Sequence, residues 1–159
     1  MRADGDALVR APAQPGADAV VDAVAAATGA LLCTVLRWDA TTERLVRVAS
    51  SRPVEYPVGG SKHFDRPWPA WLETCVVQRT GYAANGAAAV RAAFFDHELI
   101  ASLGCAGYCT VPLLVGGAVH GMLNALGPLG WATQERLRSL VLEERQHPEL
   151  GSLSRTEDA

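Results

Sequence analysis

The feature that most constrains the fold is a pair of β-rich stretches, 107–115 (GYCTVPLLV) and 118–127 (AVHGMLNALG), separated only by Gly116-Gly117. A Gly-Gly dipeptide between two such stretches is typical of a tight antiparallel hairpin. In the second stretch one set of side chains alternates with another: Val119, Gly121, Leu123 and Ala125 against His120, Met122, Asn124 and Leu126. One face is therefore apolar and small and the other is mixed, so we expect the first to pack on helices and the second to border a cavity.

Two residues stand out within this hairpin. Pro112 has no backbone N–H to donate to a neighbouring strand, so its strand is expected to lie at an edge of the sheet or to bulge there. Asn124 lies on the mixed face, where its amide either hydrogen-bonds into a cavity or is simply exposed near the end of the strand. The pattern leaves both interpretations of Asn124 open.

A second hairpin and two terminal helices are predicted around the first one. Residues 31–39 and 44–51 are β-rich and are joined by the short polar segment ATTE, as in an antiparallel hairpin. Residues 18–28 repeat Val and Ala at helical spacing, and residues 133–145 form an amphipathic pattern that begins after Thr133, a good N-cap. The order helix, hairpin, excursion, hairpin, helix predicts an α+β domain with a single antiparallel β-sheet and helices on one face.

The excursion between the hairpins, residues 51–104, is expected to cover the other face of the sheet. It starts with an irregular segment that contains four prolines and a Gly-Gly pair. A helix over 70–79, a short strand over 81–86 and two short helices follow. A sheet that is roofed by loops and short helices is a good place for a small-molecule pocket.

Length and composition indicate one domain. We predict a flexible leader over 1–15, the domain over 16–146 and a frayed tail over 147–159. The formal net charge is -3 and the arginines are spread along the chain, which argues against nucleic acid as a partner. No apolar run approaches the ~20 residues of a membrane span, and the N-terminus does not resemble a secretory signal. We therefore expect a cytoplasmic protein with reduced cysteines and no membrane association.

The hairpin sequence LGCAGYCTVPLLVGGAVHGMLNALG resembles the signature hairpin of the GAF domain family, with its Val-Pro dipeptide, glycine turn and Gly-x-Leu-Asn strand. The segment ALLCTVLRWDATTERLVRVASS matches the first hairpin of that family in spacing. The likeness covers about residues 18 to 145. More narrowly, SSRPVEYPVGG, DRPW and AAFFDHELIASLG resemble small stand-alone bacterial GAF proteins. The resemblance implies a small-molecule-binding protein of the sensor type, in which the terminal helices commonly form a homodimer.

Candidate ligand-binding residues come from the excursion and from the last hairpin. Aromatic side chains provide flat apolar walls, and Arg66 has the geometry to bind a carboxylate or a phosphate, so a small aromatic or anionic ligand is expected. A purely structural alternative is that Trp68 and Trp71 anchor the loop while Arg66 pairs with Asp65 or Glu73. The full set of candidates is Tyr56, His63, Arg66, Trp68, His97, Cys105, Tyr108 and Asn124.

An enzymatic alternative rests on Cys105, Cys109 and His97 as catalytic residues, in thiol redox chemistry similar to that of the free methionine-R-sulfoxide reductases, which are also compact GAF proteins. The cysteine pattern of that family cannot be placed on this chain. The two thiols are separated by Ala-Gly-Tyr, and a disulfide would require a tight bend, because four extended residues span roughly 13 Å. Asp96 is otherwise expected to be the N-cap of a helix that begins at His97.

Metal and cofactor sites find little support in the sequence. The isolated His63 and His120 lack the spacing of paired zinc ligands, so no metal site is predicted. Haem needs only one axial ligand, for which His63, His97, His120 and Cys105 are all candidates, so the identity of any cofactor stays open. A third class of function, a scaffold with a filled pocket, would bind no ligand at all.

Overall fold

The two predicted hairpins join through their inner strands into one antiparallel sheet. In the computed structural model, which describes residues 17–154, β1 pairs with β6 from Leu32↔Leu126 to Arg37↔Gly121. The strand order is β3-β2-β1-β6-β5-β4. The strands are β1 (Leu32–Asp39), β2 (Arg44–Ser50), β3 (Ser61–His63), β4 (Tyr82–Asn85), β5 (Gly107–Val115) and β6 (Ala118–Gly127). The architecture confirms the expected α+β class with a single sheet.

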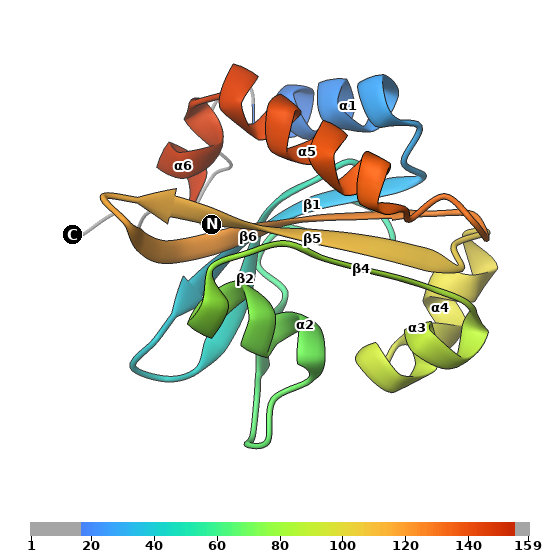
Figure 1. The fold of residues 1–159 in the computed structure, drawn as a ribbon, viewed down its shortest axis with the longest axis horizontal. Coiled ribbons are helices and arrows are strands. Elements are labelled where there is room, and N and C mark those ends of the chain that lie inside the picture. Colours follow the sequence, from blue (N-terminus) through green and yellow to red (C-terminus); the bar gives the residue numbers. More distant parts are fainter. Residues whose placement is uncertain (1–16, 155–159) are drawn as a thin grey trace, which may run out of the picture.

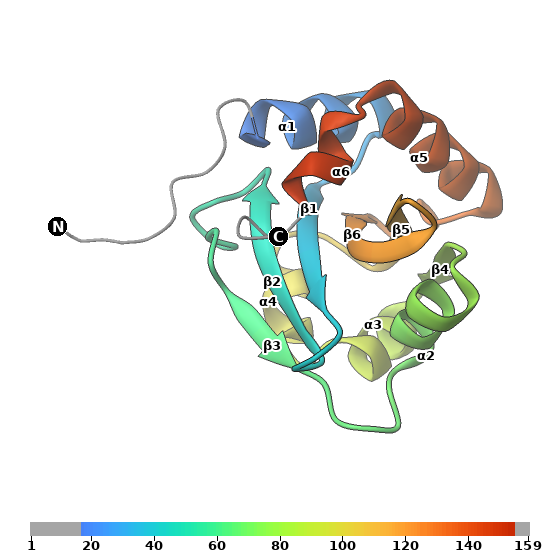
Figure 2. The ribbon, with the colours of Figure 1, turned by 90° about the vertical axis from the view of Figure 1, so that its left-hand side faces the viewer.

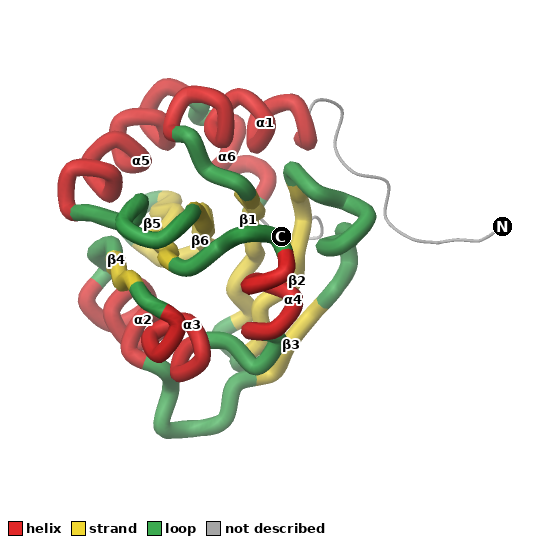
Figure 3. Tube along the Cα trace, turned by 90° about the vertical axis from the view of Figure 1, so that its right-hand side faces the viewer, coloured by secondary structure: helices red, strands yellow, loops and turns green. Residues whose placement is uncertain are grey.

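Helices cover both faces of this sheet. One face carries α1 (Ala17–Thr28), α5 (Gln134–Gln146) and α6 (Glu149–Leu153), as Figures 1 and 2 show. The other face carries the excursion, whose helices are α2 (Ala70–Glu73), a π-helical turn (Thr74–Gln78), α3 (Ala87–Ala93) and α4 (His97–Ser102). Loops make up much of this second layer (Figure 3). None of the helices within the described residues is long and apolar enough to span a membrane.

The alternation along β6 separates two hydrophobic cores, as its sequence pattern predicts. Leu123 and Ala125 belong to the core beneath α1 and α5, whereas Met122 and Leu126 belong to the core beneath the excursion. Asn124 shares the face of Met122 and Leu126, and the residue is only 7% exposed. Asn124 is therefore a buried polar residue, and the alternative of simple exposure at a strand end is wrong.

Pro112 lies where β5 lacks one strand neighbour. β4 pairs with β5 only from Asn85↔Gly107 to Tyr82↔Thr110, so no described strand flanks β5 beside Pro112 on that side. The register with β6 shifts directly afterwards, between Leu113 and Leu114. At this local edge next to a bulge, no neighbouring strand on that side requires the N–H that Pro112 lacks, as expected for a proline in a sheet.

The predicted frayed tail is partly wrong, because residues 149–153 form α6 and dock on the sheet. Leu150 is fully buried and Leu153 is nearly so, and both join the core beneath α1 and α5. Gly121 makes room for this contact, because a Cβ there would lie 2.8 Å from the Cβ of Ser154. The Leu-x-x-Leu spacing covers a single helical turn, which is too short for the sequence pattern to distinguish a helix from an unstructured tail. The leader 1–15 and residues 155–159 lie outside the described residues.

Docking of α6 predicts that Leu150→Ala destabilises the protein by about 2 to 4 kcal/mol, because the substitution leaves a cavity in the core. Urea denaturation followed by circular dichroism measures the change. The control is Leu142→Ala on the exposed side of α5, where we expect a change of no more than about 0.5 kcal/mol. Equal effects of the two substitutions would show that α6 does not contribute to the folded domain.

Candidate ligand-binding site

A cavity of about 290 Å³ lies between the sheet and the excursion. Its floor comes from β1, β2 and β6, and its roof comes from residues 56–64 and from the segment around α3 and α4. Most of the lining is apolar. The lining residues are Leu32, Thr34, Leu36, Leu45, Arg47, Tyr56, Gly60, Ser61, Lys62, Phe64, Trp71, Ala93, Phe94, Phe95, Asp96, Ile100, Asn124 and Leu126.

A chain of aromatic rings forms one wall. Phe64 contacts Trp71 edge-on with ring centroids 5.6 Å apart, and Trp71 stacks on Phe94 at 5.7 Å. Phe94 in turn contacts Tyr108 edge-on at 4.9 Å. Tyr108 is buried and does not line the cavity, so it supports Phe94 from behind. Such ring pairs stabilise each other and give the wall a fixed shape.

Asn124 is the polar group of the floor. Its neighbours across the sheet are Thr34 on β1 and Thr110 on β5, so a short polar row crosses an otherwise apolar face. The Asn124 Oδ1 atom is buried and has no hydrogen-bond partner among residues 17–154. A buried polar atom without a partner costs about 1 to 3 kcal/mol, which makes such atoms rare in folded proteins.

Arg47 enters the cavity from β2. Its guanidinium lies 4.8 Å from the centroid of the Tyr56 ring, and its Nη1 donates to the carbonyl of Pro57 at 3.0 Å. Its Nε is buried and lacks a partner among the described residues. Burial lowers the pKa of Arg47, while Tyr56 and Asp96 act in the opposite direction. The guanidinium stays charged at neutral pH because its unperturbed pKa is above about 12.

Tyr56 and Asp96 form a hydrogen bond across the roof. The Tyr56 hydroxyl donates to Asp96 at 2.7 Å. Burial first, and then this hydrogen bond to Asp96, raise the pKa of Tyr56 above its ordinary value, so the phenol stays protonated and remains the donor. Asp96 is the N-cap residue of α4, as predicted, but its carboxylate makes no capping hydrogen bond to the helix and accepts from Tyr56 instead.

Lys62 and Phe95 lie at the entrance. The Nζ of Lys62 is 4.4 Å from the centroid of the Phe95 ring and 5.5 Å from that of Phe64. Phe95 lines the cavity and is nevertheless 75% exposed. Together with Arg47, Lys62 gives the lining two cations against a single carboxylate, that of Asp96.

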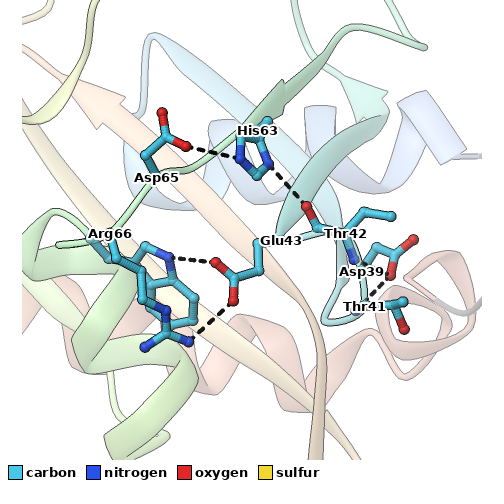
Figure 4. Close-up of polar contacts among 8 residues, drawn as sticks. Asp39, Thr41, Thr42, Glu43, His63, Asp65 and Arg66 are labelled. Atoms are coloured by element: carbon cyan, nitrogen blue, oxygen red, sulfur yellow. Dashed lines mark hydrogen bonds and ion pairs between the residues drawn. The ribbon is translucent and has the colours of Figure 1, made fainter.

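Three of the predicted ligand-binding residues, His63, Arg66 and Trp68, lie outside the cavity lining. They contact the turn of the β1–β2 hairpin (Figure 4). Arg66 Nη2 and Trp68 Nε1 donate to the Glu43 carboxylate at 3.2 and 3.3 Å, and the rings of Trp68 and Trp38 meet edge-on at 5.4 Å. Arg66 thus pairs with Glu43 rather than with Asp65 or Glu73.

His63 completes this contact. Its two ring nitrogens lie 2.9 Å from the Thr42 carbonyl and 3.1 Å from Asp65, as Figure 4 shows. The backbone N–H of Phe64 donates to the Glu43 carbonyl at 2.9 Å. The contact fixes the segment that carries Lys62 and Phe64 to the cavity, so His63, Arg66 and Trp68 support the site from outside.

Tyr56 and Asn124 are the two predicted residues that line the cavity. The three residues of the catalytic hypothesis do not line it: His97 is half-buried on α4, and the two thiols point to opposite faces of the sheet. Cys105 belongs to the core beneath the excursion and Cys109 to the core beneath α1 and α5. All four cysteines are free thiols. The structure therefore does not bring Cys105, Cys109 and His97 together at one site.

The candidate haem ligands are absent from the cavity as well. His63, His97, His120 and Cys105 all lie outside its described lining. The part of the chain that the structure describes also contains no group of three or more His, Cys, Asp or Glu side chains placed to hold a metal ion. The residues of this cavity do not fit an axially ligated haem.

Arg47, Lys62, Asp96 and the aromatic pair Phe94–Phe95 are functional candidates that the sequence did not single out as cavity residues. Arg47 lies two residues after Leu45 and shares its face of β2, beneath the excursion. Nothing in the run RLVRVASS indicates which face of this strand borders a cavity. The dipeptide Phe94-Phe95 before an acid was the one visible hint.

The single six-stranded antiparallel sheet with helices on both faces corresponds to the GAF fold. The sequence matches no family model and no curated protein. The GAF domain of an Acinetobacter phosphoenolpyruvate-protein phosphotransferase superposes with a TM-score of 0.61 at 18% identity, covering 87% of this chain and 78% of that one. The GAF domain of a Bacillus halodurans two-component sensor histidine kinase gives 0.59 at 13% identity over 85% and 88%.

A third solved structure is larger. The chromophore-binding domain of a Stigmatella aurantiaca bacteriophytochrome superposes with a TM-score of 0.58 at 15% identity, and the match covers 86% of this chain but 53% of that one. At these identities the likeness establishes the fold alone. The chain accordingly has a GAF-like fold, as its hairpin sequence predicts.

Burial predicts that the thiols are unreactive in the folded protein. It raises the pKa of Cys105 to about 11 and that of Cys109 to about 12, so both are protonated at neutral pH. We expect iodoacetamide labelling at pH 7.5, followed by mass spectrometry, to be far slower for native protein than for protein in guanidinium chloride. Because unfolded thiols ionise near their ordinary pKa of about 8.5 to 9, stability should fall as the pH rises from about 9 toward 11. Fast labelling of native Cys105 at pH 7.5 would contradict this.

Proposed function

We propose that the protein binds a small molecule in the cavity between the sheet and residues 51–104, as a ligand-binding domain of the sensor type. The observation that carries the proposal is a cavity of about 290 Å³ that combines apolar walls with two buried, unpartnered polar groups, Arg47 Nε and Asn124 Oδ1. Pockets for small ligands have this composition: mostly apolar walls with a few placed polar groups. A ligand that bonds to these two atoms would offset the cost of burying them.

Binding is favoured over thiol catalysis by what lines the cavity. Its described lining contains neither cysteine nor histidine, and its one carboxylate accepts a hydrogen bond from Tyr56. A nucleophilic thiol needs a lowered pKa and a base within hydrogen-bond distance. Burial here raises the pKa of both candidate thiols instead.

A sensor must transmit the binding of its ligand to another part of the protein, and the sheet offers a direct route from the cavity to α1 and α5. Thr34 and Asn124 face the cavity, while Val35 and Leu123, the next residues to them on β1 and β6, belong to the core beneath α1 and α5. A ligand that shifts the floor would therefore move the residues on which the two helices pack. The structural neighbours include a domain of a sensor histidine kinase and a chromophore-binding domain, which is consistent with this proposal.

The expected homodimer through the terminal helices stays a prediction. α1 and α5 lie side by side on the outer face of the sheet (Figure 2), and the side chain of Leu142 on α5 is 55% exposed. An apolar residue at this position is compatible with a helical dimer contact without requiring one.

The proposal is tested with p-cresol, a neutral probe of one ring and one hydroxyl. In an NMR titration of ¹⁵N-labelled protein, we expect p-cresol to shift the indole N–H of Trp71 and the side-chain amide of Asn124. Ile100→Phe, which extends a ring into the cavity, should abolish these shifts, whereas Leu142→Phe on the outer surface should leave them unchanged.

Thermal melting of both variants provides the folding control for this experiment. Ala93→Leu is a second cavity-filling variant if Ile100→Phe is unfolded. The proposal is overturned if p-cresol, indole and 4-hydroxyphenylacetate all leave the cavity resonances of the wild-type protein unshifted, or if the shifts persist unchanged in the filled variants.

A further inference from the structure

We infer that the cavity selects a small aromatic carboxylic acid that bears a hydroxyl group, with the carboxylate bound by Arg47 and the hydroxyl bound by Asn124. The inference rests on the proposed function and adds the chemical class of the ligand. It follows from three properties of the cavity: its charge, the separation of its two unpartnered groups, and its size.

The charge of the lining favours an anion. Arg47 and Lys62 supply two positive charges, and Asp96 supplies one negative charge whose carboxylate is bonded to Tyr56. Neither cation forms an ion pair within the described residues; both lie over aromatic rings instead. The buried Nε of Arg47 is a free donor, and a charge-assisted bond to a carboxylate is the strongest interaction that it can make.

Asn124 binds the hydroxyl at the other end of the ligand. The residue is more than nine-tenths buried, and its Oδ1 lacks a partner among residues 17–154 although Asn124 lines the cavity. The neighbouring Thr34 is buried on the same face. A hydroxyl can donate to Oδ1 and also accept from a threonine hydroxyl or an amide N–H, so it provides the partner that the Asn124 oxygen lacks. A bare hydrocarbon would leave the amide unpaired.

The separation of the two groups corresponds to a ring with a substituent at each end. Arg47 lies opposite Leu36, and Asn124 lies opposite Thr34, so the two residues are two strands and two positions apart. Strand spacing and rise place their Cα atoms roughly 12 Å apart. Both residues line the cavity, so a ring with a polar substituent at each end can span the distance between them. The aromatic wall of Phe64, Trp71 and Phe94 is suited to hold that ring by edge and face contacts.

The volume suits a small ligand such as a single substituted ring. About 290 Å³ lies at the lower end of the range of roughly 300 to 1,000 Å³ for small-molecule pockets. Lys62 lies over the ring of Phe95 at the exposed rim of the cavity, where its positive charge raises the local concentration of an anionic ligand.

The test is a matched series in which only the charged end changes: 4-hydroxyphenylacetate, the neutral 4-hydroxyphenylethanol and the cationic tyramine. Phenylacetate, which lacks the hydroxyl, reports on Asn124. By isothermal titration calorimetry we expect 4-hydroxyphenylacetate to bind at least about tenfold more tightly than 4-hydroxyphenylethanol and about tenfold more tightly than phenylacetate, with tyramine the weakest. A tenfold change corresponds to about 1.4 kcal/mol.

Two variants separate the two contacts. Arg47→Met keeps the length of the side chain and removes its charge, so the preference for the acid over the alcohol should fall to about onefold to threefold, while the preference for the hydroxyl persists. Asn124→Leu should do the reverse. If Arg47→Met does not fold, the wild-type Arg47 Nε–H resonance provides the same information, because 4-hydroxyphenylacetate should shift it and 4-hydroxyphenylethanol should not.

The outcomes distinguish this inference from the proposed function. Equal affinities for acid and alcohol, or tighter binding of tyramine, would overturn the inference and leave a ligand-binding cavity established. A preference for the acid that persists in Arg47→Met would also overturn it, since another group would then bind the carboxylate. If no member of the series and no p-cresol binds, the proposed function and the inference fail together.

Discussion

The pairing of β1 with β6 is the interaction on which the rest of the structure depends. It joins two hairpins that are separated by 56 residues, from the end of β2 at Ser50 to the start of β5 at Gly107. Once these strands pair, the intervening excursion has to return across one face of the sheet, while the terminal segments are left to cover the other. Each central strand then contributes alternate side chains to two separate cores.

The cavity follows from how the excursion is held rather than from a gap in the sheet. The Glu43 carboxylate fixes Arg66 and Trp68 at one end, and Tyr56 contacts Asp96 at the other. Between these contacts the aromatic chain from Phe64 to Tyr108 supports the roof without filling the space above Asn124. Because the excursion is fixed at both ends and supported by aromatic rings, it can leave a space above the sheet unfilled. A continuous helix would instead pack directly against the sheet.

The sequence predicted the fold well, because hairpins and amphipathic helices depend on local patterns. The alternation along β6, the glycine turn and the Thr133 cap each depend only on residues that are close in sequence. The Thr133 side chain, for example, accepts a hydrogen bond from the Arg136 backbone N–H at 3.0 Å. The site was harder to predict, because it depends on contacts between distant segments. Tyr56 and Asn124 were identified, whereas His63, Arg66 and Trp68 were selected for their chemistry and lie outside the cavity. The sequence does not single out Arg47, because nothing in its strand indicates that this face borders a cavity.

The contrast between Arg66 and Arg47 explains why composition alone misleads in such a site. Arg66 lies in a loop rich in aromatic residues, yet its side chain is 65% exposed and is paired with Glu43. An exposed and already paired guanidinium gains little by binding an anion, since water and its partner compete with the ligand. Arg47 lies in an unremarkable strand, but its Nε is removed from water and has no described partner. Specificity for a ligand arises where a charged donor has lost its solvent without gaining a partner, and this condition can be recognised only after the chain has folded.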